Sequence, residues 1–213
     1  MNVDAERFNA PGHWYTSFPS LNHWTEDFGH EDYVQALADF TDPLHLYVHI
    51  PFCKKLCSYC ICNVIISNDR AKIQHFVYHL LREIELLAPY KPDIQSIHLG
   101  GGTPSHLDRA QFTQVCEALD RVAPLRAMRE VAMEIDPRTV DSDDLRHYAS
   151  HGVTRISFGV QDFDPKVQVA INREQSPEMI ENLLEVRDLF KGVNFSFNPN
   201  MMHQMAANCG HVN

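Results

Sequence analysis

The sequence predicts an α/β fold in which parallel strands alternate with helices, as an open sheet or as part of a (β/α) barrel. Apolar stretches of strand length alternate with stripes of helical period from residue 44 onward. Polar or glycine-rich segments follow directly after the strands, at the edge where α/β proteins bind ligands. A complete barrel of eight units needs about 200 residues, which a 213-residue chain with an N-terminal arm does not supply.

Five segments have the composition of strands and end at turn-forming or polar residues. They are residues 44–50, 95–99, 130–135, 155–160 and 193–197. The first four are followed by a cysteine loop, by Gly100-Gly-Gly-Thr-Pro104, by Asp136-Pro-Arg138 and by Gln161-Asp-Phe163. Their polar side chains are therefore expected to meet at one edge of the sheet.

Helices are predicted before the first strand and between the strands. The clearest apolar stripe, with residues three and four positions apart, runs over residues 70–88. The predicted helices are residues 31–40, 70–88, 108–122, 141–150 and 176–189. Asp141 or Ser142 is a suitable N-cap for the fourth helix, and Pro177 suits the first turn of the last one. Residues 1–43, rich in aromatic residues, proline and histidine, are expected to form an ordered arm.

Composition and charge narrow the class of protein. A hydrophobic fraction of 44% with 22% charged residues is typical of a globular protein. A net charge of −10 without a basic stripe argues against nucleic acid as a partner, and no apolar run is long enough for a membrane span. Because the N-terminus is too polar for a signal peptide, we expect the protein in the cytoplasm, where thiols stay reduced. We also expect it to be a monomer.

Four of the six cysteines share one loop, with the spacing C-x3-C-x2-C at Cys53, Cys57 and Cys60, followed by Cys62. Three thiolates so close in sequence can hold one iron–sulfur cluster and leave one iron open for substrate or cofactor. Structural zinc usually takes two separate C-x2-C pairs, and a second pair is missing here. A cytoplasmic disulfide between neighbours is also disfavoured.

The loop and four further motifs resemble the radical S-adenosylmethionine enzymes, and among them the oxygen-independent coproporphyrinogen III oxidases. The matching segments are residues 47–63, His98-Leu-Gly-Gly-Gly-Thr-Pro104, Glu134-Ile-Asp-Pro-Arg138, Ser157-Phe-Gly-Val-Gln-Asp-Phe163 and Asn172-Arg-Glu-Gln175. The arm at residues 11–20 is similar as well, and the order of the motifs agrees from about residue 7 to 195. The resemblance implies a partial barrel of the radical S-adenosylmethionine type.

The resemblance also implies a set of site residues. Cys53, Cys57 and Cys60 would ligate a 4Fe-4S cluster, whereas Cys62 would be needed without ligating iron and His49 would lie beside the loop. Two S-adenosylmethionine molecules would bind. The first would face Tyr47, Gly101 and Glu134, and the second would face Tyr59, Gly102, Thr103, Gln161 and Arg173.

Read without the resemblance, several of these residues have ordinary explanations. The triple glycine is compatible with a tight turn, Glu134 with a solvated strand end, and Arg173 with a surface salt bridge to Glu174.

The implied reaction belongs to porphyrin and haem biosynthesis. A 5′-deoxyadenosyl radical would convert two propionate side chains of coproporphyrinogen III to vinyl groups, giving protoporphyrinogen IX with loss of carbon dioxide. This oxidoreductase chemistry would require a low-potential electron donor and an electron acceptor under anaerobic conditions. Arg7, Lys54 and Lys55 are candidates for contacts with the acidic substrate.

The sequence divides into an arm at 1–43, a partial barrel at 44–195 and a divergent tail at 196–213. Trp14 stands where the family has an arginine, and the tail lacks the family's acidic residue and proline turn. We therefore expect weak or no activity from a chain truncated or frameshifted after about residue 195. The alternatives are a haem chaperone-like relative, which tends to lack Cys62 and the 172–175 motif, a nonproductive cluster-binding fragment and a zinc module.

Overall fold

The computed structural model describes residue 23 and residues 25–197, and the chain divides into two units between Phe40 and Thr41. The described part of the first unit contains the helix α2 (His30–Asp39). Glu31 and Asp32 lie in its first turn, where negative charge favours the helix dipole. The predictions that involve Arg7, Trp14 and the tail after residue 197 lie outside the described residues.

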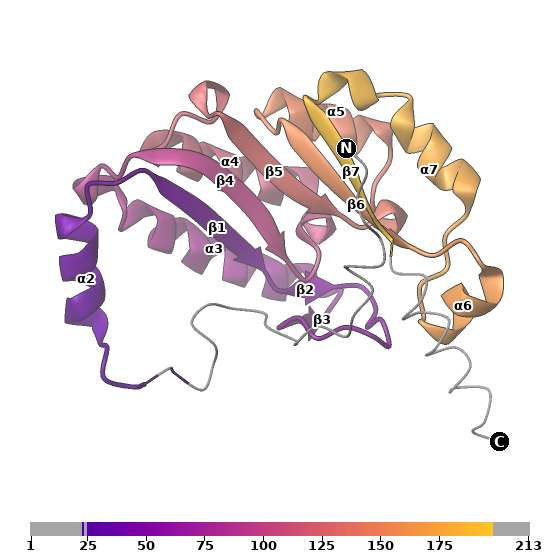
Figure 1. Cartoon of the computed structure of the whole chain (residues 1–213), viewed down its shortest axis with the longest axis horizontal. Coiled ribbons are helices and arrows are strands. Elements are labelled where there is room, and N and C mark those ends of the chain that lie inside the picture. The colour runs from indigo at the N-terminus through magenta and orange to yellow at the C-terminus, as the bar shows by residue number, and fades with distance from the viewer. Residues whose placement is uncertain (1–22, 24, 198–213) are drawn as a thin grey trace, which may run out of the picture. The chain divides into compact units, whose positions relative to one another are not determined.

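The second unit contains the predicted parallel sheet. Its strands, in spatial order, are β1 (Leu44–Ile50), β4 (Ile94–Gly101), β5 (Glu130–Ile135), β6 (Arg155–Gln161) and β7 (Gly192–Phe197) (Figure 1). All four pairings are parallel, so each strand lies beside the next long strand of the chain. Within the described residues β1 and β7 are open edges, as in a barrel that is not closed.

Helices pack on one face of this sheet (Figure 1). They are α3 (Arg70–Glu85), α4 (Arg109–Val122), α5 (Ser142–Ser150) and α7 (Pro177–Leu184). The facing strand positions are buried and apolar, and they form one core with the helices. Each fully buried aliphatic or aromatic side chain contributes about 1.5–3 kcal/mol, so this face carries most of the stability.

The opposite face of the sheet is polar. Its side chains alternate with the buried ones along each strand, as the period of two requires. Among them are His45 and Tyr47 on β1, His98 on β4 and Glu134 on β5, none of which is buried. This polar face leads to the carboxyl ends of the strands, where the cysteine loop lies.

The local sequence sets the ends of the helices. Asp108, Asp141 and Ser176 are the N-caps of α4, α5 and α7, and each side chain accepts a hydrogen bond from a backbone amide three residues on. Of the two candidates for the cap of α5, Asp141 is the one used. The first long helix ends at Glu85 rather than at residue 88, because Pro89 cannot continue an α-helix.

Several short elements were not predicted. The α-helix α6 (Pro165–Ala170) and the strand pair β2 (Phe52–Cys53) and β3 (Ile65–Ile66) belong to loops of the site. The helix predicted for 176–189 is divided into α7 and a 3-10 turn. The 3-10 helices are η2 (Ala88–Tyr90), η3 (Pro104–His106), η4 (Leu125–Ala127), η5 (Pro137–Thr139) and η6 (Arg187–Leu189).

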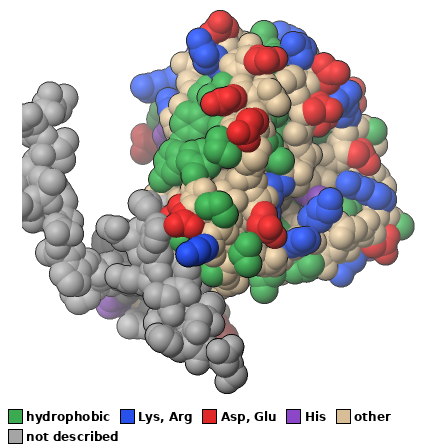
Figure 2. Space-filling model, turned by 90° about the vertical axis from the view of Figure 1, so that its right-hand side faces the viewer, with side chains coloured by type: hydrophobic (Ala, Val, Ile, Leu, Met, Phe, Trp, Pro, Cys, Tyr) green, Lys and Arg blue, Asp and Glu red, His purple; other side chains and the backbone are tan. Residues whose placement is uncertain are grey.

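Exposed aromatic side chains accompany the open edge at β7. Phe195 and Phe197 are exposed, and the ring of Phe163 lies 5.8 Å from that of Phe197. Figure 2 views the side of the molecule that carries β7 and α7, and it shows hydrophobic side chains gathered among charged ones. None of the helices in the described part of the chain has the length and apolar character of a membrane span.

Candidate functional site

The base of the cysteine loop is fixed by the pairing of β2 with β3. The amide of Ile65 donates a hydrogen bond to the carbonyl of Pro51 at 2.7 Å. Phe52 is fully buried, and its ring packs edge-on against Phe76 of α3 with centroids 5.3 Å apart. Cys53, the next residue, is therefore anchored to the core although the loop has little regular structure of its own.

The far side of the loop is attached to residues 170–172, at the end of α6 and directly after it. The amide of Ser58 donates to the carbonyl of Ile171 at 3.1 Å, and its hydroxyl donates to the carbonyl of Ala170 at 3.1 Å. The side-chain amide of Asn172 donates to the carbonyl of Leu56 at 2.8 Å. Asn172 has φ 56°, a left-handed conformation that asparagine adopts more readily than most residues. The loop is thus fixed at its base by strand pairing and on its far side by hydrogen bonds to backbone carbonyls.

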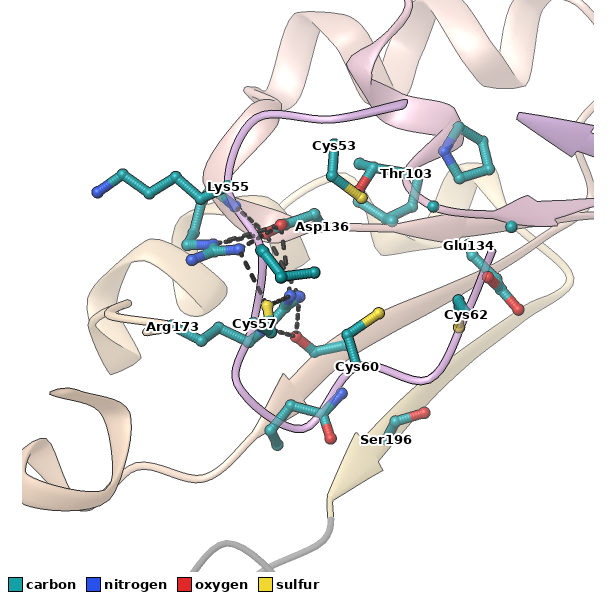
Figure 3. A pocket seen from close by; sticks show the side chains of 18 of the residues that line it. Cys53, Lys55, Cys57, Cys60, Cys62, Thr103, Glu134, Asp136, Arg173 and Ser196 are labelled. Atoms are coloured by element: carbon teal, nitrogen blue, oxygen red, sulfur yellow. Dashed lines mark hydrogen bonds and ion pairs between the residues drawn. The ribbon is translucent and has the colours of Figure 1, made fainter. Parts of the chain in front are cut away.

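A cavity of about 240 Å³ lies between the loop and the carboxyl ends of β4, β5 and β6 (Figure 3). It brings together most of the predicted site residues, from segments more than 100 positions apart. The predicted residues that line it are Cys53, Cys57, Tyr59, Cys60, Cys62, Gly101, Gly102, Thr103, Glu134, Gln161 and Arg173. Tyr47 and His49 are not among its lining residues.

The thiols differ in their surroundings. Cys57 is buried, Cys53 and Cys60 are partly exposed, and Cys62 is exposed. Sγ of Cys53 lies 3.2 Å from Oγ1 of Thr103, and burial raises the pKa of Cys53. Partial burial and the neighbouring Cys60 raise the pKa of Cys62 to about 11. Cys53 and Cys62 therefore carry protons at neutral pH unless a metal replaces them.

The glycines after β4 let the strand end lie directly against the cysteine loop. The amide of Gly102 donates to the carbonyl of Ile50 at 2.8 Å. A Cβ atom at Gly102 would lie 2.7 Å from the carbonyl oxygen of Pro51 and 3.0 Å from Sγ of Cys53. Gly101 has φ 114°, a conformation that side chains rarely permit. The glycines are thus required by the contact between backbones, whether or not a ligand is bound.

A buried ionic network lies under the loop. Asp136 accepts hydrogen bonds from Nε and Nη2 of Arg138 at 3.0 and 2.7 Å, and from Nη1 of Arg173 at 3.4 Å. Burial alone would raise the pKa of Asp136, but the hydrogen bonds and charges of the two arginines outweigh it and hold that pKa below its usual value. The carboxylate is therefore ionised in the folded protein.

The surface salt bridge that we considered between Arg173 and Glu174 is not formed. Arg173 is buried, and it donates to the carbonyl of Gly159 through Nε at 3.0 Å and Nη2 at 2.6 Å. Its Nη1 lies 3.5 Å from Sγ of Cys57 (Figure 3). The side chain points into the protein, where Asp136 and the carbonyl of Gly159 pair its buried guanidinium.

A second set of hydrogen-bonded polar side chains lies on the polar face of the sheet, beside the cavity. Nε2 of His98 donates to the carboxylate of Glu134 at 3.2 Å, and this hydrogen bond raises the pKa of His98. The ring of Tyr47 stacks on that of His98 with centroids 5.8 Å apart. The Asn63 carbonyl can only accept, so His49 donates to it through Nε2 at 2.9 Å and accepts from the Tyr47 hydroxyl through Nδ1 at 3.1 Å.

Gln161 and Tyr59 complete the predicted residues. Gln161 ends β6 with φ 70°, which is uncommon for a residue other than glycine and frequent at binding sites. Tyr59 packs against Val167 and Ile171, and burial raises its pKa. Tyr59 therefore lines the side of the cavity next to α6.

The donor set indicates which kind of metal group fits. Across residue 23 and residues 25–197, no three His, Cys, Asp or Glu side chains come close enough to hold one metal ion. An iron–sulfur cubane takes one thiolate for each iron, so its ligands lie around a larger body. Cys53, Cys57 and Cys60 on one cavity fit that arrangement.

Sequence reasoning missed part of the site. Asp136, Arg138 and Ser157 were noted in motifs but given no role, and Ser196 was not considered as a site residue. All four line the cavity. The sequence signal for Asp136 and Arg138 was their position directly after a predicted strand, because polar residues at the carboxyl ends of parallel strands lie where ligands bind. Ser157 could have been found from the period of two along β6.

Comparisons with known proteins agree with this geometry. A family model described as the Radical SAM superfamily matches residues 47–204. The oxygen-independent coproporphyrinogen III oxidase of Escherichia coli strain K12 is 40% identical over 182 residues, which are 84% of this chain and 40% of that protein. The Helicobacter pylori strain J99 protein of the same name is 33% identical over 209 residues, 92% of this chain and 46% of that protein.

A solved structure has the same fold. That of coproporphyrinogen III oxidase from Escherichia coli, described as a radical SAM enzyme, matches with a TM-score of 0.80 and 36% identity. The match covers 94% of this chain and 49% of the other. The chain therefore spans less than half the length of the curated relatives and of the solved structure that it matches.

Proposed function

Because this chain belongs to the radical SAM superfamily, we propose that it binds a 4Fe-4S cluster through Cys53, Cys57 and Cys60. The fourth iron would be left for S-adenosylmethionine. The observation that supports the proposal most strongly is the arrangement of three thiols, a glycine strand end and a buried ionic network around one cavity. When bound, such a cluster would supply one electron, and a carbon–sulfur bond of S-adenosylmethionine would break to give methionine and a 5′-deoxyadenosyl radical.

The chain's own residues would orient the cofactor and exclude water. We assign Tyr47, Gly101 and Glu134 to the first S-adenosylmethionine. The carboxylate of Glu134 is exposed at the cavity and can accept from an ammonium or ribose hydroxyl group. The ring of Tyr47 stacks on that of His98, which is hydrogen-bonded to Glu134, so Tyr47 lies near Glu134 on the polar face of the sheet. Tyr47 would therefore contact a part of the cofactor that extends beyond the cavity.

A second S-adenosylmethionine is assigned to Tyr59, Gly102, Thr103, Gln161 and Arg173, which all line the cavity. The guanidinium of Arg173 can bind a carboxylate in bidentate geometry. This guanidinium already donates to Gly159 and Asp136. Binding of the cofactor's carboxylate would therefore replace some of those hydrogen bonds with hydrogen bonds to the cofactor. We also propose that Cys62 and His49 support the cysteine loop without ligating iron.

For the whole protein we propose oxidative decarboxylation of two propionates of coproporphyrinogen III, giving the vinyl groups of protoporphyrinogen IX. The relatives that cover most of this chain carry that activity in their names. A low-potential electron donor and an electron acceptor complete the reaction. The polar face of the sheet next to the cavity is the surface on which this tetracarboxylate would lie.

The cluster is tested by anaerobic reconstitution followed by iron and sulfide analysis. We expect about four irons per chain and a rhombic or axial electron paramagnetic resonance signal on reduction that changes when S-adenosylmethionine is added. Serine replacement of Cys53, Cys57 and Cys60 should abolish binding, and Cys116→Ala, a buried cysteine of α4, should not. Iron retained by the triple variant would refute the assignment.

The activity is tested separately, by anaerobic turnover with reductant, S-adenosylmethionine and coproporphyrinogen III. We expect carbon dioxide and protoporphyrinogen IX from the whole protein, and weak or no turnover from this chain alone. Tight haem binding without turnover by the whole protein would instead favour a haem chaperone.

A further inference from the structure

Arg138 is held rigidly beside Cys57. Its Nε and Nη2 donate to the two oxygens of Asp136 at 3.0 and 2.7 Å, so the guanidinium is fixed in bidentate geometry. Its Nη1 donates to the carbonyl of Asn172 at 3.2 Å, the residue that also anchors the cysteine loop. With these bonds made, Nη2 lies 3.8 Å from Sγ of Cys57. The contact with sulfur is therefore set by the fold before any ligand binds.

The network around Cys57 carries an excess of positive charge. Arg138 and Arg173 supply two positive charges and Asp136 one negative charge, which leaves one positive charge. The side chains are only 18%, 9% and 9% exposed, in the order Arg138, Arg173 and Asp136. A buried charge needs a partner. The sulfur of Cys57, 3.5 and 3.8 Å from the two guanidinium groups, supplies it when it is a thiolate.

We propose that Arg138, positioned by Asp136, raises the reduction potential of the iron–sulfur cluster that Cys57 holds. This inference rests on the proposed function. Reduction adds one negative charge to a cluster, and hydrogen bonds to a ligand sulfur together with nearby positive charge stabilise that reduced form. Arg138 would act through the sulfur of Cys57, which its Nη2 approaches to 3.8 Å, so it is a positioning residue.

The role differs from that of a residue which only supports the fold. A supporting residue would change the stability of the chain or the amount of cluster bound, and leave the potential of the bound cluster unchanged. A tuning residue changes the potential of fully loaded protein. Arg173 is not used for the test, because it is assigned to the cofactor and its replacement would disturb more than one contact.

The test compares three variants of the reconstituted chain. Arg138→Met removes both the charge and the hydrogen bond, and Arg138→Gln removes the charge but keeps an amide donor. Arg146→Met is the matched control, because Arg146 forms an exposed ion pair with Asp143 on α5. Iron and sulfide are measured first, and the midpoint potential is then determined at constant pH by a redox titration followed by electron paramagnetic resonance.

We expect full loading in all variants and a midpoint potential that is most negative in Arg138→Met, intermediate in Arg138→Gln and unchanged in Arg146→Met. A fully loaded Arg138→Met protein with the wild-type potential would overturn the inference and leave the cluster assignment intact. Failure of both Arg138 variants to load, with normal loading of the control, would show that Arg138 builds the site and would overturn it as well. A wild-type chain that binds no cluster would overturn the inference together with the proposed function.

Discussion

Replacement of Asp136 by asparagine tests the buried network in the metal-free chain. The carboxylate is buried, and it is the shared partner of Arg138 and Arg173. Asparagine has nearly the same shape, so the change removes the negative charge without opening a cavity. It leaves two guanidinium groups in the interior with a neutral amide between them.

The expected loss of stability follows from that burial. Removing one partner of a buried ion pair costs about 3–5 kcal/mol. The amide oxygen of asparagine can still accept one hydrogen bond from Arg138, so we expect the lower end, about 3 kcal/mol. Since about 1.4 kcal/mol corresponds to a tenfold change, the ratio of unfolded to folded protein should rise roughly a hundredfold. Asp143→Asn, at an exposed ion pair, should cost less than about 0.5 kcal/mol.

The assay is urea unfolding under reducing conditions, followed by circular dichroism at several pH values. The folded-state pKa of Asp136 is lowered, so its contribution is fully present above the unfolded pKa of about 3.9 and is lost as pH falls through the folded value. The free-energy difference between wild type and Asp136→Asn should be constant from neutral pH to about pH 5 and shrink below about pH 4. A cost below that of the Asp143 control at neutral pH would refute the reasoning.

Two further predictions concern the strand ends. Gly102→Ala would place Cβ 2.7 Å from the carbonyl of Pro51, so we expect a cost of about 1–3 kcal/mol and reduced iron content. Gly192→Ala is the control, because its added Cβ would lie at an ordinary 3.4 Å from the nearest atom. Stability and iron content should be unchanged in this variant. Equal iron content in the two variants would contradict the argument. Glu134→Gln removes the hydrogen-bonded charge that raises the pKa of His98. A pH titration by nuclear magnetic resonance should show a lower pKa for that histidine, and an unaltered titration would show that Glu134 is not its partner.

Local sequence patterns were sufficient for most of the fold. The composition of five segments of strand length, with turn-forming or polar residues after them, predicted all five long strands. The capping residues Asp108 and Ser176 fixed helix starts, since a cap acts within its own turn. The helix α6 was missed because six residues give too little periodicity to detect.

The sequence by itself determined that Cys53, Cys57 and Cys60 share one loop, and that polar groups follow the strands of a parallel sheet. Only the tertiary structure decided which of those groups meet. Arg138 and Arg173 reach Cys57 across 81 and 116 positions of the chain, and Arg173 takes Asp136 rather than its neighbour Glu174. Such choices depend on how far each loop folds over the sheet and on which charges become buried, and neither is encoded in a local pattern of residues.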